Sequence, residues 1–376
     1  MPATSPTDTS REQEWMRRAL ELAEQGIALA SPNPLVGAVL VQGNRVIGEG
    51  YYTYEGRQHA EIQAIEQAGE AVRGATLFIN LEPCCHTGRT GPCTEAILAA
   101  GVKRVITAIL DPNPQVSGRG FDRLRQAGVE VEVGLCREEA QQLNESFARY
   151  IRTGLPFVTL KAAMTLDGKI AAPDDNSGWI TSEEALTYVQ QQRHAHDAIL
   201  TGIGTVLADD PLLTDRCGRP RRRPLLRVVM DSRLRIPLSA KMLERVGDDL
   251  LIFCSFSADA DKRKALEQQG AQICLLPDEG RPNLFEALKE LGRREITSVL
   301  LEAGAELNWA ALEAGLVDKV FLYYAPKILG GRDSLPLAGG RGIRSMREAQ
   351  AVRRTRFYRF GTDFAIEGYL RDIDWQ

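Results

Sequence analysis

Residues 59–85, HAEIQAIEQAGEAVRGATLFINLEPCC, decide the fold of the first half of the chain. Apolar residues recur at helical spacing in HAEIQAIEQAG, so a helix is predicted to begin near His59. The apolar run ATLFINLE predicts a buried strand. Beyond Cys93, TEAILAAG is typical of a second helix and KRVITAIL of a second strand. Because strands alternate with helices, this region is predicted to form a three-layer α/β/α sheet domain.

The segments on either side extend the prediction to two domains. Residues 1–10 are expected to be a disordered tail rather than a signal peptide, because they lack a basic and an apolar region. Residues 11–30 have an amphipathic helical pattern, and VGAVLV and RVIGEGYY predict a hairpin. The first domain is expected to span 11–150, followed by a linker at 151–156. Over 157–376 strands and helices alternate again, beginning with the strand PFVTLKAAMTLDGKIA, which predicts a second α/β domain.

Composition and charge exclude several classes of function. With 376 residues, 44% apolar and 26% charged, the chain has the composition of a globular protein. The formal net charge of −4 offers no basic excess for nucleic acid or an anionic membrane. No apolar run approaches the ~20 residues that a membrane span needs. A cytoplasmic location is expected, where thiols stay reduced, and the basic run RRR at 221–223 is expected to be a solvated loop.

One histidine and three cysteines stand close together, although the chain has only four histidines and seven cysteines. A disulfide, a structural metal site and a catalytic metal site could each explain this grouping. An odd number of cysteines in a reducing compartment counts against a disulfide. His59, Cys84 and Cys93 suit zinc and leave a fourth position for water, which favours a catalytic site. Cys85 or His86 could supply the fourth ligand of a structural site.

Glu61 decides between the two metal hypotheses. It stands two residues after the histidine, where a carboxylate beside an open zinc position can transfer protons between water and a leaving group. His-x-Glu followed by Pro-Cys-x-x-Cys is the pattern of zinc deaminases of cytosine and adenine, although here eight residues (85–92) separate Cys84 from Cys93. The polar, glycine-rich insertion CHTGRTG contains Arg89 and is expected to hold a phosphate of the substrate, with an idle surface loop as the alternative.

The motifs together resemble one family. PNPLVGAV, HAEIQAI, LEPCCHTGRTGPC and DPNPQVSGRG resemble the deaminase half of the bifunctional deaminase/reductase of riboflavin biosynthesis. KAAMTLDGKIA, WITS, TGIGTVLADDPLLT, LLEAGAELNWA and YYAPKILGG resemble its reductase half. The resemblance covers almost everything after the N-terminal tail. It implies a cytidine-deaminase-like first domain with zinc and a dihydrofolate-reductase-like second domain with NADPH.

The resemblance assigns roles in the deaminase half position by position. Zinc-bound hydroxide would replace the 2-amino group of a diaminopyrimidinone ribosylamine 5′-phosphate with oxygen, and Glu61 would transfer the protons. Two residues depart from the family's usual pattern: Gly91 predicts a looser loop before the third ligand, and Cys85, where serine is commoner, makes the zinc ligation ambiguous. The zinc ligands would be His59, Cys84 and Cys93, and the substrate would contact Asn33 at its pyrimidine and His86, Asp111 and Asn113 at its phosphoribosyl part.

The reductase half has weaker support from the residues themselves. GIGTVL at 202–207 begins like a dinucleotide fingerprint but lacks the third glycine. In LLEAGAELNWAAL a strand ends near Gly304 and a helix follows, an arrangement that can bind phosphate or be purely structural. Lys161 and Arg193 are cations that a phosphorylated substrate needs, or else surface salt-bridge partners.

The resemblance completes the expectations for this half. NADPH would deliver hydride to C1′ of the sugar and open the ribose into a ribityl chain. The residues expected to contact NADPH are Ala163, Trp179, Thr205, Asp209, Gly304, Ala305, Glu306, Leu307, Asn308, Trp309 and Ala310. The residues expected to contact the substrate are Lys161, Ser177, Arg193, Leu213, Arg216 and Glu302.

Two other functions stay open on the residues alone. A deaminase of free nucleosides or of tRNA would share the zinc pattern, but the acidic balance counts against tRNA and the phosphate loop against an unphosphorylated nucleoside. A zinc-stabilised binding module would need a closed four-ligand site and no role for Glu61. The expected partner is a small phosphorylated pyrimidine, with no nucleic acid and no membrane. A homo-oligomer, either a dimer or a tetramer through the reductase domain, fits the family resemblance.

Overall fold

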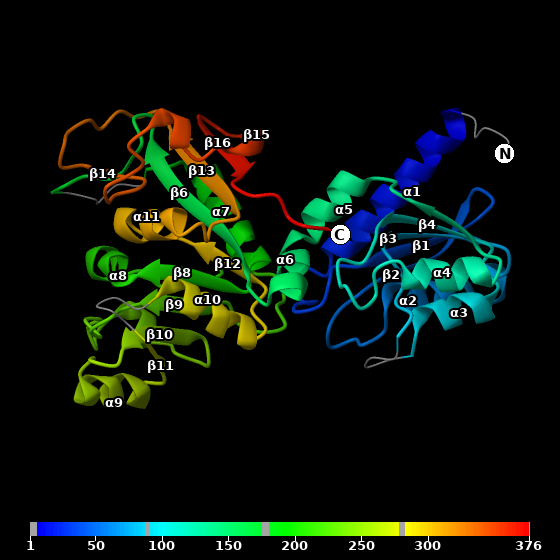
Figure 1. Cartoon of the computed structure of the whole chain (residues 1–376), viewed down its shortest axis with the longest axis horizontal. Coiled ribbons are helices and arrows are strands. Elements are labelled where there is room, and N and C mark those ends of the chain that lie inside the picture. The colour runs from blue at the N-terminus through cyan, green and yellow to red at the C-terminus, as the bar shows by residue number, and fades with distance from the viewer. Residues whose placement is uncertain (1–5, 87–90, 175–179, 278–282, 376) are drawn as a thin grey trace. The chain divides into compact units, whose positions relative to one another are not determined.

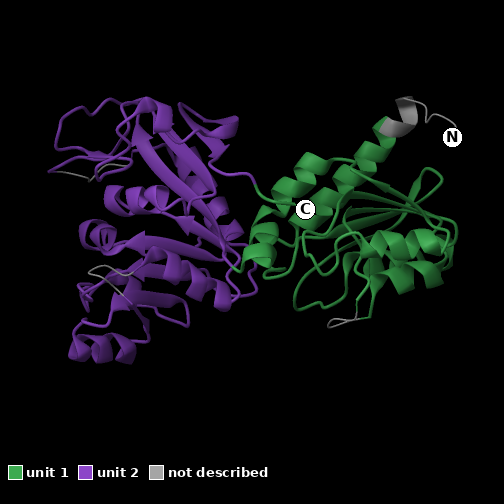
Figure 2. Ribbon diagram, in the orientation of Figure 1, with its two compact units in different colours: residues 1–154, 373–376 green, residues 155–372 purple. Residues whose placement is uncertain are grey.

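The chain folds into two compact units (Figure 2). The computed structural model describes residues 6–86, 91–174, 180–277 and 283–375. One unit comprises Met1–Gly154 together with Ile373–Gln376, and the other comprises Leu155–Asp372. The division after Gly154 lies within the segment 151–156, where the sequence predicts a linker, although the helix that precedes it continues to Thr153.

A five-stranded mixed sheet forms the middle of the first unit (Figure 1). Its strand order is β2-β1-β3-β4-β5, with β1 antiparallel to both neighbours and β3, β4 and β5 parallel. The predicted hairpin is confirmed, because β1 and β2 pair across a turn at Gly43, whose φ of 61° is left-handed. The strands are β1 (Gly37–Gln42), β2 (Arg45–Tyr51), β3 (Thr76–Leu81), β4 (Arg104–Ile109) and β5 (Glu130–Val133).

Helices cover both faces of this sheet, so the predicted three-layer architecture is confirmed. Ala64, Ile97 and Leu124 from α2, α3 and α4 pack into the core on one face. Met16 from α1 and Ala140 from α5 pack into the core on the other. The helices are α1 (Pro6–Glu24), α2 (Ala60–Ala68), α3 (Cys93–Ala100), α4 (Arg119–Gln126), α5 (Arg137–Leu143) and α6 (Glu145–Thr153), with a 3-10 turn at Gly69–Val72.

The first helix differs from the expectation at both ends. Residues 1–10 are expected to be a disordered tail, but α1 begins at Pro6. Proline is favoured at the first helical position because its missing N–H has no intrahelical partner there. The helix ends at Glu24 rather than at residue 30. The chain then turns against its own backbone, where a Cβ on Gly26 would lie only 2.8 Å from the Tyr52 carbonyl oxygen.

The last residues of the chain return to the first unit. The Arg152 guanidinium near the end of α6 donates a hydrogen bond to the Asp374 carboxylate at 2.6 Å. Trp375 packs against the apolar cluster that contains Met16 and Ala140. The first unit is therefore built from two separate stretches of sequence.

A nine-stranded sheet forms the middle of the second unit. Its order is β11-β10-β9-β8-β12-β6-β13-β16-β15. The first seven strands are parallel to one another, and β16 pairs antiparallel with both β13 and β15. A separate two-stranded ribbon pairs β14 with β7. The strands are β6 (Phe157–Thr165), β7 (Lys169–Ala171), β8 (Ala198–Gly202), β9 (Leu226–Met230), β10 (Leu250–Ser255), β11 (Gln272–Leu276), β12 (Ser298–Leu301), β13 (Lys319–Ala325), β14 (Leu335–Pro336), β15 (Arg353–Phe360) and β16 (Asp363–Tyr369).

One segment that the sequence predicts as a single strand forms two strands in the structure. The stretch PFVTLKAAMTLDGKIA is expected to be continuous, but a turn separates β6 from β7. Gly168 adopts a left-handed φ of 76° in that turn, which glycine tolerates without strain. The second part therefore leaves the main sheet and pairs with β14 instead.

Helices also cover both faces of the second sheet. α10 (Leu284–Arg293) and α11 (Ala305–Glu313) contribute to one core, and α8 (Ile203–Asp209) and α9 (Ala260–Gln268) contribute to the core on the other face. α7 (Glu183–Ala195) packs on an aromatic cluster that includes Phe321 and Tyr323. Two 3-10 turns lie at Lys241–Leu243 and Met346–Glu348. None of the helices within the described residues is long and apolar enough to span a membrane.

The carboxyl ends of the parallel strands lie at one edge of this sheet, which is where ligands bind in open α/β folds. α8 starts directly after β8, and α11 starts shortly after the neighbouring strand β12. Two helix N-termini therefore lie next to each other at that edge.

Candidate active sites

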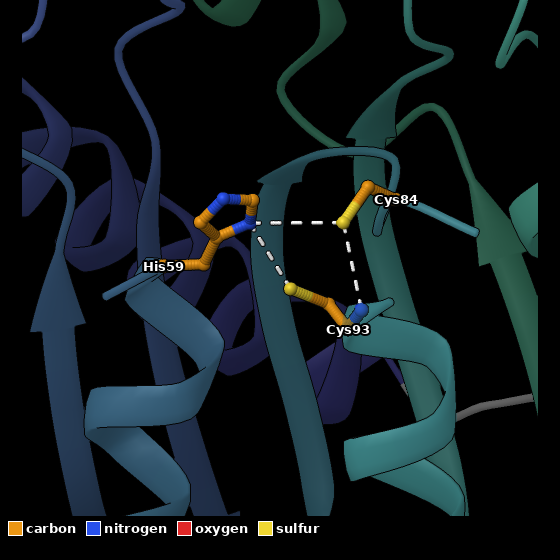
Figure 3. Close-up of side chains that lie close together, drawn as sticks. All are labelled: His59, Cys84 and Cys93. Carbon is orange, nitrogen blue, oxygen red and sulfur yellow. Dashed lines mark hydrogen bonds between the residues drawn. The ribbon is translucent and has the colours of Figure 1, made fainter. Parts of the chain in front are cut away.

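Three metal-binding side chains meet around the starts of α2 and α3 in the first unit (Figure 3). The Nδ1 atom of His59 lies 3.0 Å from the Sγ atom of Cys93 and 3.7 Å from that of Cys84. All three ligand atoms lie within 4.8 Å of one another. The fold thus brings together the three residues that the sequence pattern indicates as zinc ligands.

The local fold explains why residues so far apart in sequence meet. His59 is the N-cap residue of α2, Cys93 is the first residue of α3, and Cys84 lies shortly after the end of β3. The Cys93 N–H donates to the Cys84 sulfur at 3.5 Å. Hydrogen bonds from Cys93 and His59 lower the pKa of the Cys84 thiol although burial opposes them. A thiolate, the form that binds zinc, is therefore favoured here.

Glu61 is the buried acid beside this cluster. It lies in the first turn of α2, is only 2% exposed, and its Oε2 atom has no hydrogen-bond partner among the described residues. Burial raises the pKa of Glu61, and although His59 opposes the shift, the charge of Cys84 adds to it. A buried carboxylate oxygen without a partner, next to three metal-binding groups, fits a site that an ion and a water complete.

Asn33 reaches the cluster through Tyr52, a residue that the motifs did not single out. The Asn33 amide donates to the Tyr52 hydroxyl at 2.6 Å. The Tyr52 ring meets the His59 ring edge-on, with centroids 5.5 Å apart. Asn33 is therefore one side chain away from the metal cluster.

Two buried asparagines hold the segment that carries Asn33. Asn80 accepts a hydrogen bond from the Gly37 N–H and donates one to the Leu35 carbonyl, both at 2.9 Å. Asn144 accepts from the Leu35 N–H at 2.8 Å and donates to the same carbonyl at 2.9 Å. Satisfied polar networks of this kind make a loop rigid. Asn80 has a sequence signal, since it is an amide inside an otherwise apolar strand.

Glu82 organises the loop that carries Asp111, and it too was missed. Its carboxylate accepts hydrogen bonds from the backbone N–H groups of Asp111 at 3.1 Å and of Gly118 and Gly120 at 2.9 Å. Position 120 must be glycine, because a Cβ there would lie 2.2 Å from the Pro83 carbonyl oxygen. The Glu82 carboxylate therefore joins three backbone N–H groups of this loop.

Asp111 and Asn113 each accept a hydrogen bond within their own loop, and the Asp111 carboxylate accepts the Asn113 N–H at 2.8 Å. Burial raises the pKa of Asp111 to about 7, and the charges of Glu82 and Cys84 contribute to the shift. The Asp111 carboxylate therefore lies close enough to the metal cluster for the charge of Cys84 to affect its pKa. The Asn113 side chain accepts the Gln115 N–H at 3.0 Å.

Cys85 and His86 follow the second ligand along the chain. His86 is exposed and Cys85 is partly buried, and within the part of the chain that the structure describes neither belongs to the metal-binding cluster. Burial raises the pKa of the Cys85 thiol, which disfavours the thiolate that zinc binds. The predicted phosphate loop includes Arg89, which lies outside the described residues.

In the second unit, three predicted substrate residues form one buried ion cluster. Glu302, directly after β12, accepts two hydrogen bonds from Arg193 on α7 (2.9 and 3.0 Å) and one from Lys161 on β6 (3.3 Å). The three side chains are only 11–12% exposed, so Lys161 and Arg193 are not surface salt-bridge partners. Although burial alone would raise it, the pKa of Glu302 is lowered to about 2 by the two cations.

The two adjacent helix N-termini carry the predicted cofactor residues. The two helix starts are in close contact. A Cβ placed on Gly304 would lie 3.8 Å from the Thr205 hydroxyl, and one placed on Gly202 would lie 3.4 Å from the Leu307 side chain. The buried Oδ1 atom of Asn308 has no hydrogen-bond partner among the described residues. The N–H donors of the helix starts fit the phosphates of a cofactor. The Asn308 oxygen is an acceptor, so it fits a hydroxyl or amide donor of the same cofactor instead.

The other predicted residues of this unit are more dispersed. Leu213 is buried and has a left-handed φ of 52°, a strained conformation for leucine. The Arg216 side chain is exposed, while its backbone N–H donates to Gln190. The remaining cofactor residues are Ala163 on β6, Asp209 at the end of α8, and Ala305, Glu306, Trp309 and Ala310 on α11. Ser177 and Trp179 lie outside the described residues.

Comparison with known proteins gives matches to both units. The pattern of the RibD C-terminal domain matches residues 156–366. That of the cytidine and deoxycytidylate deaminase zinc-binding region matches residues 9–109. The riboflavin biosynthesis protein RibD of Actinobacillus pleuropneumoniae is 41% identical over 96% of this chain and 95% of its own length.

Solved structures agree over nearly the full length. Acinetobacter baumannii RibD is similar with a TM-score of 0.84 and 36% identity, covering 96% of this chain and 99% of that one. A diaminohydroxyphosphoribosylaminopyrimidine deaminase/5-amino-6-(5-phosphoribosylamino)uracil reductase from Thermotoga maritima has a TM-score of 0.83 and 34% identity, with the same coverage.

The two folds, the His–Cys–Cys cluster and these matches define a zinc-binding deaminase joined to a reductase. The cytidine-deaminase-like and dihydrofolate-reductase-like folds predicted for the two halves are confirmed. The chain belongs to the RibD family of riboflavin biosynthesis proteins. Its function is thus that of a bifunctional deaminase and reductase in riboflavin biosynthesis, and neither a lone nucleoside deaminase nor a silent zinc module matches both units.

Proposed function

We propose that the first unit deaminates 2,5-diamino-6-ribosylamino-4(3H)-pyrimidinone 5′-phosphate and that the second unit reduces the ribosyl group of the product to ribityl. The final product is then 5-amino-6-ribitylamino-uracil 5′-phosphate. The observation that carries the proposal is Glu61, a buried carboxylate with an unpartnered oxygen beside three metal-binding side chains. The name of the Thermotoga maritima relative, of similar fold over nearly its whole length, supports the same pair of reactions.

In the deaminase site, His59, Cys84 and Cys93 hold the metal. Zinc supplies a Lewis acid that makes water nucleophilic near neutral pH. Glu61 takes a proton from the attacking water and delivers it to the leaving amine. Its burial and its unpartnered oxygen suit this role, because the carboxylate must meet the water and the amine directly.

The residues around the cluster position the substrate. Asn33, held through Tyr52, orients the pyrimidine ring next to the metal. Asp111, Asn113 and His86 contact the phosphoribosyl part. The loops that carry Asn33 and Asp111 are fixed by Asn80, Asn144 and Glu82, so the site is preformed and little ordering is left for the binding step.

In the reductase site, NADPH supplies the hydride. The start of α11 from Gly304 onward offers free N–H groups to the cofactor phosphates. Lys161 and Arg193 share the single negative charge of Glu302, so the cluster keeps one positive charge for a phosphorylated substrate. Leu213 and Arg216 contact the substrate from the loop that follows α8.

Mass spectrometry of the substrate incubated with the purified full chain tests the whole proposal. Without NADPH, we expect the amine to be replaced by oxygen and nothing more. With NADPH, we expect a further gain of two hydrogens. Reduction before deamination, or no change with either mixture, would contradict the proposed substrate and order of steps.

We also propose that the chain forms a homo-oligomer, a dimer or a tetramer, in the cytoplasm. β15 is the outermost strand of the nine-stranded sheet, and Phe357 on this strand is 73% exposed, so the edge can pair with a second copy. All seven cysteines are free, as they would be in a reducing compartment. Light scattering of the purified chain measures the assembly, and a monomer mass would contradict the oligomer.

A further inference from the structure

Arg221 opens the basic run at 221–223, and it is not the solvated residue that the composition of the run predicts. Its side chain is only 11% exposed. One guanidinium nitrogen, Nη1, donates to the carbonyl oxygens of Arg193 (3.2 Å) and His194 (2.8 Å), and the other, Nη2, donates to that of His196 (2.8 Å). These are among the last carbonyls at the end of α7, where a cation also interacts favourably with the helix dipole.

The same guanidinium also binds the loop after α8. Nη1 of Arg221 donates to Oδ2 of Asp215 at 3.0 Å, and that oxygen also lies 2.9 Å from Nδ1 of His194. The other carboxylate oxygen of Asp215 accepts the Cys217 N–H at 2.8 Å. Arg221 therefore joins the end of α7 to the loop around Asp215.

A metal ion is an alternative explanation for this cluster, because ligand atoms of His194, Asp215 and Cys217 lie within 4.8 Å of one another. The position of Arg221 counts against it. A guanidinium 3.0 Å from the carboxylate oxygen is an unfavourable neighbour for a second cation. Both oxygens of Asp215 already have hydrogen-bond partners, so the cluster is complete as an ion pair.

The two segments joined by Arg221 both carry proposed substrate contacts. Arg193 lies in the last turn of α7, where its guanidinium binds Glu302 and also donates to the Thr214 carbonyl at 3.2 Å. Leu213 and Arg216 lie on either side of Thr214 and Asp215 in the loop. A shift of the helix end relative to the loop would change the spacing between these contacts.

We propose that Arg221 is a positioning residue of the reductase site, which fixes the end of α7 against the loop 213–216 so that Arg193 and the loop meet one substrate molecule. The inference rests on the proposed function, because it takes Arg193 to be a substrate contact. Arg221 itself does not touch the substrate. A lysine would keep the charge but could not donate to all four of these oxygens in a plane.

The test uses the full chain with Arg221→Lys, and with Arg223→Lys as the matched control in the same run. Arg223 binds the backbone carbonyls of Arg294 and Glu295 and pairs with the Asp197 carboxylate, and none of these groups belongs to α7 or to the loop 213–216. For Arg221→Lys we expect the reductase KM for the deaminated intermediate to rise roughly tenfold, because misplaced contacts weaken binding. We expect Arg223→Lys to leave this KM unchanged. A merely structural role would lower the unfolding temperature and leave the KM of the folded enzyme unaltered.

A double-mutant cycle with Arg193→Gln shows whether Arg221 acts through Arg193. We expect Arg221→Lys to change the KM by less than about twofold once Arg193 is replaced. NADPH binding, measured by fluorescence titration, should be unchanged in all variants and shows that the unit is folded. If Arg221→Lys does not fold, Asp215→Asn weakens the same link, because asparagine keeps only one of the two accepting oxygens, and it should also raise the KM.

Three outcomes overturn the inference. The first is an unchanged KM in folded Arg221→Lys, and in Asp215→Asn where that variant replaces it. The second is an equal increase with and without Arg193. The third is a normal KM in Arg193→Gln alone, which would refute the proposed substrate site itself and so separates the two failures.

Discussion

Glu61 and Glu302 are both buried carboxylates of the proposed active sites, yet their surroundings act on the negative charge in opposite ways. Glu61 lies beside the metal-binding thiols, and burial with the charge of Cys84 raises its pKa. Glu302 lies between Lys161 and Arg193, which lower its pKa to about 2 although burial opposes them. Burial is common to the two, so the neighbours decide the state of each acid.

The difference shows what each site needs. Glu61 has an oxygen without a partner among the described residues, and it lies beside three metal-binding side chains. Glu302 has three donors from two cations of the protein. The deaminase site is therefore completed by an added metal ion, whereas the ion cluster of the reductase site is complete within the chain. The first environment suits a group that moves a proton, and the second suits a group that holds cations in place.

The largest effect is expected from removing zinc. Dialysis of the full chain against a chelator should abolish deamination. Without the ion that His59, Cys84 and Cys93 bind, nothing activates the attacking water. Reduction of the added deaminated intermediate should continue at its original rate. Metal analysis by mass spectrometry and the two separate assays measure this, and added zinc should restore deamination. Loss of both activities would contradict the claim that zinc serves the deaminase site alone.

Glu61→Gln should have the next largest effect. We expect the deaminase kcat to fall roughly 10²–10⁴-fold, the usual contribution of a proton-transferring side chain. Zinc content should stay at the wild-type value, because Glu61 is not one of the three clustered ligands. Glu66→Gln is the matched control, since Glu66 is an exposed residue of the same helix. A variant that loses zinc together with activity would show that Glu61 supports the metal instead.

Glu302→Gln should mainly affect stability. It leaves Lys161 and Arg193 in a buried site without their counter-charge, which typically costs about 3–5 kcal/mol. Urea denaturation measures the change, with exposed Glu313→Gln on α11 as the control. A variant as stable as the wild type would mean that the two cations repel each other little.

The pH dependence of this stabilisation has a definite sign. The pKa of Glu302 is about 2 in the folded chain, below its ordinary value of 4.5. Its contribution is therefore fully present above pH 4.5 and is lost as the pH falls from 4.5 towards 2. The stability difference between wild type and Glu302→Gln should narrow over that interval. A difference that stays constant there would contradict the depressed pKa.

The smallest effect is expected at the other end of α7. Ser182 caps this helix, where its hydroxyl accepts the Ala185 N–H at 3.4 Å. Ser182→Ala should cost about 1 kcal/mol of unfolding free energy. The reductase KM should not change, because Arg193 and its contacts with Glu302 lie in the last turn of the helix. A raised KM would show that the ion cluster depends on the whole helix.

The proposed zinc ligands could be predicted from the sequence because histidine and cysteine are recognisable as metal-binding residue types. His59 and Glu61 share a short motif, and Cys84 and Cys93 each lie next to a strand or helix that the apolar pattern reveals. Glu82 was not found, because its partners are backbone N–H groups, which every residue has. Tyr52 was missed for a similar reason, since only the fold shows that it bridges Asn33 and His59.

The reductase site depends more on tertiary structure. Lys161, Arg193 and Glu302 come from β6, α7 and the end of β12, and no local pattern links them. Only the family resemblance grouped them. Arg221 was wrongly expected to be solvated, because three arginines in a row usually face water and the carbonyls that it binds belong to a helix some 25 residues earlier.

The return of the last residues to the first unit matters for anyone who wants to separate the two enzymes. A gene truncated after residue 154 would encode a deaminase without Trp375, and the apolar cluster beneath that side chain would face water. It would also lose the Asp374 carboxylate that pairs with Arg152. In topological terms the reductase is an insertion into the deaminase rather than an appendage. An independent deaminase would therefore need its own C-terminal stretch rejoined by a short bridge.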